Sequence, residues 1–301
     1  MFSGLRRLFT SKSQFISVTN LNDLYLQTSV DLTNSLGGNI SLNSNRDRHT
    51  NRMFVLDFSG DVMATGAHGL AQEVTAILAF ANTDDEVLIK IESPGGAVHS
   101  YGYASSQIAR LKDAGISTVV SVDKVAASGG YMMACIGDTI ISAPFAILGS
   151  IGVVAELPNF SRILDSIGVD YKQYTAGKFK RTISSMVPIT KDGEDKFVED
   201  LDKTYDLFKE HVLKYRPNLD IESIATGEHW YGSVAKELGL VDLICTSDEY
   251  ILSKMNDTEL IKISYIANKS WSEKMKGAII SITEALLIRG ITLFSYSGIL
   301  R

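Results

Sequence analysis

Residues 122–134, Val-Asp-Lys-Val-Ala-Ala-Ser-Gly-Gly-Tyr-Met-Met-Ala, place Ser128 between small residues and a pair of glycines. The β-branched, apolar run at 116–122 predicts a buried strand, and residues 131–135 predict the first turns of a helix. Ser128 therefore falls on a strand-to-helix turn, where the free N–H groups of a helix start face whatever binds there. Glycine lets backbone approach a ligand closely because it has no Cβ. The turn leaves two roles for Ser128, a helix N-cap or a nucleophile.

Strands and helices alternate through the middle of the chain. Strands are expected at 54–58, 87–91, 116–122, 139–142 and 169–175, and helices at 69–81, 101–113, 159–167 and 193–215. The last of these helices carries the clearest apolar stripe. Alternation of this kind predicts an α/β fold with mostly parallel strands.

The composition is that of an ordinary globular protein. The chain has 301 residues, 45% of them hydrophobic and 21% charged. A net charge of −6 gives no reason to expect nucleic acid as a partner. Cys135 and Cys245 stand in apolar surroundings without zinc-type spacing, so buried thiols are expected rather than a disulfide.

Three segments are expected along the chain: a polar N-terminal extension at 1–52, a domain at 53–250, and a C-terminal extension at 251–301 with an amphipathic helix. The N-terminal apolar block at 2–9 is too short to span a bilayer, which needs about 18 or more apolar residues. The longer apolar run at 278–294 is interrupted by Glu284 and Arg289, each costly at a bilayer centre. Both segments are compatible with peripheral membrane contact. The alternatives are a frayed N-terminus and a C-terminal helix that packs on a partner.

A second glycine turn, Ser-Pro-Gly-Gly at 93–96, follows the preceding strand. In a parallel sheet both turns lie at the carboxyl edge, so their N–H groups can face each other across a small space. An oxyanion hole needs that geometry, because its donors point at the charge that develops on a tetrahedral intermediate. By itself a Pro-Gly-Gly sequence is most often a simple turn. The pairing with the turn at Ser128 is what favours the oxyanion hole.

A nucleophilic serine also needs a base. The chain has five histidines, His49, His68, His99, His211 and His229, and none has a matching aspartate pattern. The Gly-x-Ser-x-Gly elbow is missing as well. A Ser-His-Asp triad is therefore a weak hypothesis.

Several motifs together resemble the signal peptide peptidase A family of serine proteases, most of all its SohB-like branch. They lie at 91–96, 122–134, 142–152, 174–182, 226–232 and 239–242, and the likeness covers residues 54–250. The resemblance implies a ClpP/crotonase-like fold, a repeated β-β-α superhelix with a mostly parallel sheet. It also implies an endopeptidase that works through an acyl-enzyme with a Ser-Lys dyad and needs no metal or organic cofactor.

The same resemblance implies a role for each matching residue. Ser128 is the nucleophile, Lys180 the general base, and Ser150 the residue that orients the lysine amine. Gly95 or Gly96, with the N–H of Ser128 or Gly129, forms the oxyanion hole.

The lysine assignment carries a physical requirement. A free lysine has a pKa of about 10.4, so it must be partly buried or placed beside other cations to act as a base near pH 7. Lys178 is the competing base. Without the resemblance, Lys178, Lys180 and Arg181 would simply be a solvated basic turn.

The resemblance further implies peptide or unfolded-protein substrates, signal peptides and membrane-protein fragments among them, and a ring-shaped homo-oligomer. It implies the periplasmic side of the bacterial inner membrane, although the N-terminal span of SohB-like proteins is not visible in this sequence. Two other functions remain open. One is a crotonase-like acyl-CoA enzyme, and the other is a non-catalytic, membrane-associated scaffold of the same fold.

Overall fold

The structure, a computed structural model, describes residues 15–37 and 51–266. The terminal segments considered for membrane contact, 2–9 and 278–294, lie outside these residues. The chain divides into two units, and the larger, Val18–Ser264, contains the candidate site discussed below. Within the described part of the chain, no helix combines the length and apolar character that a bilayer crossing requires.

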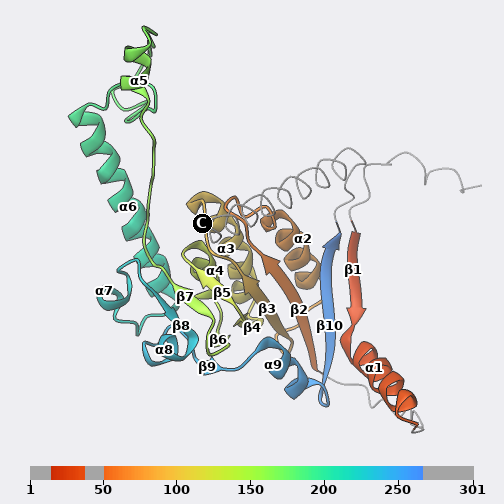
Figure 1. Ribbon diagram of the computed structural model, residues 1–301. Helices are drawn as coiled ribbons and strands as arrows, with labels where there is room; N and C mark the ends of the chain where they lie inside the picture. The colour runs from red at the N-terminus through yellow and green to blue at the C-terminus, as the bar shows by residue number, and fades with distance from the viewer. Residues whose placement is uncertain (1–14, 38–50, 267–301) are drawn as a thin grey trace, which may run out of the picture. The chain divides into compact units, whose positions relative to one another are not determined.

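A seven-stranded sheet forms the centre of this unit (Figure 1). Its strands follow the order β1 (Phe15–Asn20), β10 (Thr258–Ile266), β2 (Asn51–Ser59), β3 (Glu86–Glu92), β4 (Ser117–Val122), β6 (Thr139–Ser142) and β9 (Leu243–Ile244). From β10 to β9 every pairing is parallel. The predicted α/β fold with a mostly parallel sheet is confirmed.

A three-stranded sheet lies beside the carboxyl end of the large one. It consists of β5 (Val125–Ala127), β7 (Ile147–Gly149) and β8 (His229–Tyr231). The helices are α1 (Leu21–Ser35), α2 (Ala67–Leu78), α3 (Val98–Asp113), α4 (Gly129–Ala134), α5 (Ser161–Ser166), α6 (Lys191–Tyr215), α7 (Ile221–Ile224), α8 (Gly232–Glu237) and α9 (Ser247–Lys254).

A unit of two strands and a helix repeats through the fold. In β4–β5–α4, one strand belongs to the large sheet and the next to the small sheet, and a helix follows. The same order precedes it, because β3 leads to Ser93, which bridges to Ala126 of β5, and then to α3. The strand pair β6–β7 repeats the beginning of the unit. This arrangement agrees with the predicted β-β-α repeat.

The two faces of the large sheet are covered differently. On one face, α2 packs against β2 and α3 packs against β4, and the rings of Phe58 of β2 and Tyr101 of α3 meet edge to face with centroids 6.5 Å apart. On the other face, Met53 and Val55 lie in a core cluster with Leu21 of α1 and Ile251 of α9. These packed residues do not extend to the carboxyl edge of the sheet, where Asp57 and Ser59 are exposed.

One sequence-based expectation differs from the structure. The prediction of a strand at 169–175 is wrong, because this segment pairs with no strand among the described residues. Its large side chains Val169, Tyr171 and Tyr174 are all exposed. The alternating polarity of this segment therefore does not indicate a strand with one buried face. β10, which follows the segment predicted as the domain at 53–250, pairs with β2. Cys135 and Cys245 are free thiols, as expected.

Candidate active site

Ser128 has a strained backbone. It lies between β5 and α4 with φ 51° and ψ −118°. A non-glycine residue in this region costs about 1–3 kcal/mol and persists only where its surroundings hold it. Here the Ser128 N–H donates to the carbonyl of Gly149 at 2.8 Å, and the Met132 N–H donates to the carbonyl of Ser128 at 2.9 Å.

The Ser128 hydroxyl is not used to hold the helix. Ser128 occupies the N-cap position of α4, but its side chain makes no capping hydrogen bond. The residue is half-buried, and its Oγ bonds to no other side chain in the described part of the chain. Of the two roles considered for Ser128, the geometry does not support the N-cap. The hydroxyl is therefore free to react.

The two glycine turns are in direct contact. A Cβ atom added to Gly95 would lie 2.7 Å from the Cβ of Ser128 and 2.9 Å from the nitrogen of Gly129. Gly95 also has φ 93°, a conformation that other residues rarely adopt. The structure therefore brings together residues 95, 128 and 129.

The N–H groups of these turns are not equally available. Gly95 donates to the hydroxyl oxygen of Ser93 at 3.1 Å, and Ser128 donates to Gly149. Gly96 and Gly129 donate to no acceptor in the described ranges 15–37 and 51–266. Gly129 is the first residue of α4, where the helix supplies no acceptor. The free donors beside Ser128 are thus at Gly96 and Gly129.

Ser150 lies beside Ser128. The parallel pair β5–β7 aligns Ala127 with Gly149, so Ser128 and Ser150 each directly follow one residue of this pair. Both serines have φ 51°. The Ser150 N–H donates to the carbonyl of Glu228 at 2.6 Å.

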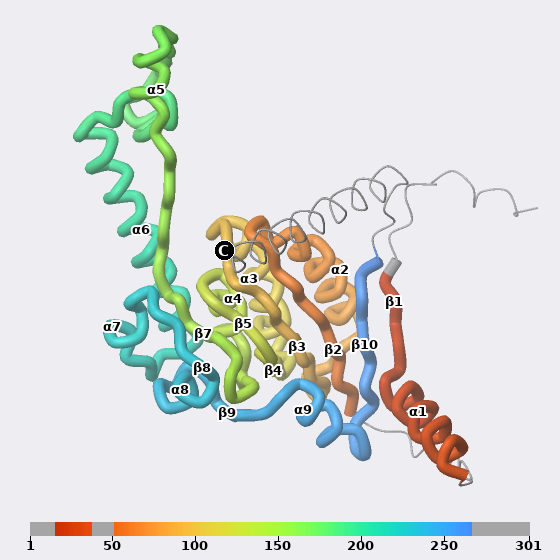
Figure 2. Tube along the Cα trace, in the orientation of Figure 1, coloured from red at the N-terminus to blue at the C-terminus, as the bar shows by residue number. Residues whose placement is uncertain are grey.

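Lys180 lies on the segment between α5 and α6, and its side chain is exposed. This segment sits at the N-terminal end of α6, because a Cβ added to Gly193 would lie 2.1 Å from the carbonyl oxygen of Thr182. Lys178 forms an ion pair with Asp192 at 3.8 Å, in the first turn of the same helix. Figures 1 and 2 show α5 beyond that end of α6.

The other end of α6 lies against α4. His211 Nε2 is 2.8 Å from the carbonyl oxygen of Met132, one helical turn after Ser128. Gly193 and His211 are 18 residues apart in one helix, which corresponds to about 27 Å at 1.5 Å per residue. A lysine side chain cannot bridge that distance. Within one chain, the structure does not bring Lys180 to Ser128.

Two sequence profiles cover most of the chain. The profile of peptidase family S49 matches residues 110–261, and that of the peptidase family S49 N-terminal region matches residues 39–108. The chain belongs to peptidase family S49. It is therefore a serine-type peptidase, and the expected family is confirmed.

Among its relatives are proteins named as probable protease SohB. The one from Buchnera aphidicola subsp. Acyrthosiphon pisum is 48% identical over 237 residues, which is 78% of this chain and 70% of the relative. The one from Haemophilus influenzae is 52% identical over 222 residues, which is 74% of this chain and 63% of the relative. The chain thus matches about two thirds of the length of these two proteins.

A solved structure shows a more distant likeness. It is a membrane-bound stomatin-specific protease in complex with a substrate peptide, with a TM-score of 0.47 and 12% identity. The match covers 76% of this chain and 97% of that one.

The described histidines of this S49 peptidase offer Ser128 no base. His68, His99 and His229 are exposed, and none of them bonds to the Ser128 hydroxyl. Burial lowers the pKa of His211, whose Nε2 is engaged with Met132. His49 lies outside the described residues. The described histidines therefore do not support a Ser-His-Asp triad.

Sequence reasoning missed the residues that support the glycine turn at 93–96. Ser93 and Tyr101 are fully buried, and their hydroxyl oxygens are 2.5 Å apart. Burial raises the pKa of Tyr101, so this hydroxyl keeps its proton. The sequence does not predict this contact, because a serine in a turn and a tyrosine in the next helix have no characteristic spacing.

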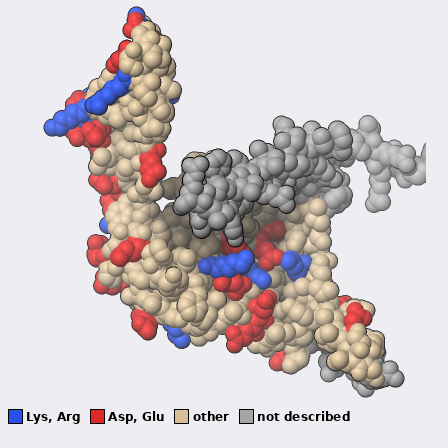
Figure 3. Space-filling model, viewed as in Figure 1, with Lys and Arg blue, Asp and Glu red and all other residues tan. Residues whose placement is uncertain are grey.

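A charged cleft borders the site of this S49 peptidase. It has a volume of about 280 Å³ and is lined by Asp57, Phe58, Ser59, Lys90, Ile91, Glu92, Asp123 and Lys124. Figure 3 shows basic and acidic atoms gathered on this side of the molecule. Glu92 directly precedes Ser93, and Lys124 lies four residues before Ser128.

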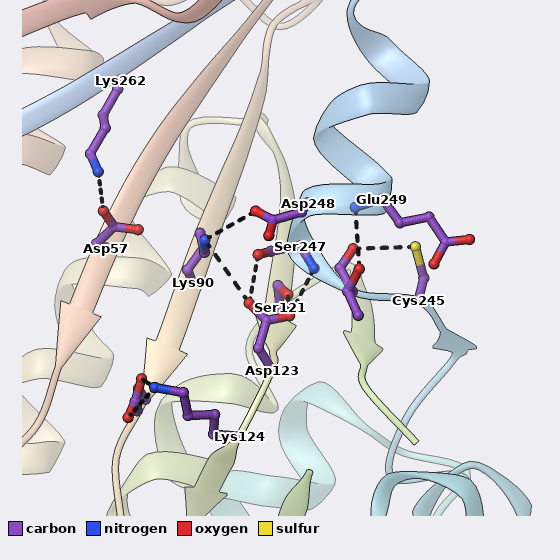
Figure 4. Close-up of polar contacts among 12 residues, drawn as sticks. Asp57, Lys90, Ser121, Asp123, Lys124, Cys245, Ser247, Asp248, Glu249 and Lys262 are labelled. Atoms are coloured by element: carbon purple, nitrogen blue, oxygen red, sulfur yellow. Dashed lines mark hydrogen bonds and ion pairs between the residues drawn. The ribbon is translucent and has the colours of Figure 1, made fainter. Parts of the chain in front are cut away.

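The charges of the cleft are paired with one another (Figure 4). Lys124 contacts Glu92 at 3.0 Å, and Lys262 contacts Asp57. Lys90 lies 4.0 Å from Asp123 and 3.8 Å from Asp248. The Asp123 carboxylate also accepts from the N–H of Ser247 at 2.8 Å, which anchors the start of α9. Each lysine of the cleft therefore lies beside at least one carboxylate.

Proposed function

We propose that this peptidase hydrolyses peptide bonds through an acyl-enzyme formed on Ser128. The observation that carries the proposal is the contact between the Gly95 turn and the Ser128–Gly129 turn, which leaves a free hydroxyl beside two free N–H groups. The Ser128 oxygen attacks the carbonyl carbon of the substrate. The N–H groups of Gly96 and Gly129 then stabilise the negative charge on the carbonyl oxygen.

Proton transfer is assigned to Lys180. Its neutral amine takes the proton of the Ser128 hydroxyl and gives it to the leaving amine as the peptide bond breaks. Water then attacks the ester, Lys180 takes a proton from that water, and the proton returns to Ser128 as the acid product leaves. In this proposal Ser150, which follows the residue paired with Ala127, hydrogen-bonds the lysine amine.

Lys180 reaches Ser128 from a second copy of the chain in this proposal. The segment 152–190 exposes many large apolar side chains, among them Val154, Ile163, Ile167, Tyr171, Tyr174 and Phe179. Soluble monomers rarely expose so many, and a set of this size marks an interface. A neighbouring copy that covers the segment would also bury Lys180. Burial disfavours the charged amine and so supplies the low pKa that a base requires.

The substrate class follows the resemblance: peptides and unfolded protein, signal peptides and membrane-protein fragments among them. Peripheral membrane contact belongs to the same proposal. The acyl-CoA enzyme and the non-catalytic scaffold have no observation of their own in their favour.

The test is the removal of each reacting group from the full chain. Ser128→Ala and Lys180→Ala are each expected to abolish cleavage of an unfolded protein substrate, while circular dichroism and thermal unfolding stay those of the wild type. A fluorophosphonate probe should label Ser128 in the wild type and not in Ser128→Ala. Lys178→Ala, two residues away on the same segment, is the matched control and should keep its activity. Near-normal turnover by either active-site variant would refute the dyad.

A further inference from the structure

Tyr101 of α3 lies fully buried beneath both glycine turns. A Cβ added to Gly129 would lie 2.4 Å from the Tyr101 ring. A Cβ added to Gly60 would lie 2.4 Å from its hydroxyl oxygen. The ring therefore packs against the residue that supplies one of the proposed oxyanion donors.

The hydroxyl of Tyr101 connects the same side chain to the other turn. It donates to the carbonyl oxygen of Asp61 at 2.8 Å, and a carbonyl only accepts, so the single hydroxyl hydrogen is committed. The hydroxyl of Ser93, 2.5 Å away, must then donate to Tyr101. This leaves the Ser93 oxygen to accept the N–H of Gly95 at 3.1 Å. The hydrogen bonds run in one direction, from Gly95 through Ser93 and Tyr101 to Asp61.

This relay determines which N–H of the turn is free. Because the Gly95 N–H points at Ser93, the following peptide leaves the Gly96 N–H without a partner in the described residues. The Gly96 backbone is held from behind, since a Cβ there would lie 2.1 Å from the carbonyl oxygen of Val62. The Ala97 N–H donates to the same oxygen at 2.8 Å.

We propose that Tyr101, acting with Ser93, is a positioning residue that sets the spacing of the two oxyanion donors. Its ring supports Gly129, and its hydroxyl orients the turn that carries Gly96. The inference rests on the proposed function of Ser128. Donors of this kind bind the developing oxyanion more strongly than the ground-state carbonyl, so the effect belongs to the transition state.

The experiment compares Tyr101→Phe and Ser93→Ala with the wild-type full chain. Each variant breaks the relay without adding bulk, and Ser93→Ala does so without touching the ring. We expect kcat to fall about 10- to 100-fold while KM changes less than about twofold. The double variant should fall no further than the worse single variant, because both changes break one relay. Affinity for a peptide boronate, which forms a tetrahedral adduct, should fall in step with kcat, while affinity for the peptide product stays unchanged.

Tyr131→Phe is the matched control. Tyr131 is equally buried, and its hydroxyl donates to the carbonyl of Leu240 at 3.0 Å, away from the turn at 93–96. This variant should lose thermal stability like Tyr101→Phe but keep kcat within about twofold of the wild type.

Each of the following outcomes would overturn the inference. Unchanged kcat in Ser93→Ala or Tyr101→Phe assigns the pair a structural role only, and fully additive losses in the double variant exclude a shared relay. A wild-type chain without cleavage activity and without fluorophosphonate labelling of Ser128 overturns the proposed function and this inference with it. An active, labelled wild type with equally active variants overturns this inference alone.

Discussion

At the scale of single residues, Gly95 shows how tightly the site is built. Its φ of 93° already favours glycine, and an added Cβ would lie 2.7 Å from the carbonyl oxygen of Ala127 as well as from the Cβ of Ser128. Backbone atoms cannot yield as the end of a flexible side chain can. A methyl group at this position would therefore separate the two glycine turns.

Gly95→Ala is expected to lower kcat/KM at least about 100-fold, the cost of losing one oxyanion donor or more. Peptide cleavage and fluorophosphonate labelling of Ser128 measure the effect. Gly102→Ala is the control, since a Cβ at Gly102 of α3 meets nothing within 4 Å. That variant should stay active and gain up to about 1 kcal/mol of stability from better helix propensity. Full activity in Gly95→Ala would show that the turns do not work together.

At the scale of elements, α6 is the longest helix in the described part of the chain, and its C-terminal half joins it to the rest. His211 contacts α4 through the carbonyl of Met132, and Arg216 donates to both carboxylate oxygens of Asp242 at 2.9 and 2.7 Å. The N-terminal end of α6 holds the segment with Lys180 instead. One helix thus links the nucleophile's surroundings to the apolar segment that we propose as an interface.

The contact of α6 with α4 should depend on pH. Burial lowers the pKa of His211, so between its folded pKa and the unfolded value of about 6.5 the unfolded chain binds more protons. The stabilising contribution is complete above pH 6.5 and is lost as pH falls through the folded pKa. Urea unfolding from pH 7.5 to 5 should show a steeper loss of stability in the wild type than in His211→Gln, whose amide can still donate to Met132. His99→Gln, on the exposed side of α3, should keep the wild-type slope. Equal slopes in all three proteins would exclude His211 as the cause.

At the scale of the whole molecule, one copy of the chain does not bring the two members of the proposed dyad together. Ser128 and Ser150 lie together at the ends of β5 and β7, whereas Lys180 lies about a helix length away. The exposed apolar side chains of segment 152–190 surround that lysine in sequence. The distance between the two residues and the exposed apolar segment are both explained if each active site takes its serine from one copy of the chain and its lysine from the next.

Mixing the two inactive variants tests this arrangement. Subunits of Ser128→Ala and Lys180→Ala, dissociated and reassembled together in equal amounts, should regain about a quarter of the wild-type activity, because a quarter of random neighbour pairs combine an intact serine with an intact lysine. Ser128→Ala mixed with the double variant is the control and should stay inactive. Mixed oligomers without activity would place the lysine in the same chain as its serine.

Much of this site follows from short stretches of sequence. The strand before Ser128, the helix after it and the glycine pair between them depend on side-chain periodicity and on the missing Cβ of glycine, which are local properties. The second turn, at 93–96, can be predicted from the sequence for the same reason. The parallel α/β fold follows from the order of such elements along the chain.

Other features depend on residues that meet only when the chain folds. The alternating polarity of 169–175 predicts a strand, but a strand needs a partner, and there is none beside it in the described residues. The place of β10 beside β2 joins segments some 200 residues apart. Which glycine N–H is free depends on Ser93, Tyr101 and Asp61, which come from three different elements or loops.

The sequence by itself determined the central strands and helices of this protein and the two glycine turns, because each rests on the conformational preferences of a few neighbouring residues, and its resemblance to a known family supplied the candidate nucleophile. Only the tertiary structure decided that the Ser128 hydroxyl does not cap α4, that Gly95 donates inward, and that Lys180 lies far from Ser128 in one chain. The reason is physical: hydrogen-bond partners and distances between elements are set by packing, and packing joins residues that no local pattern connects.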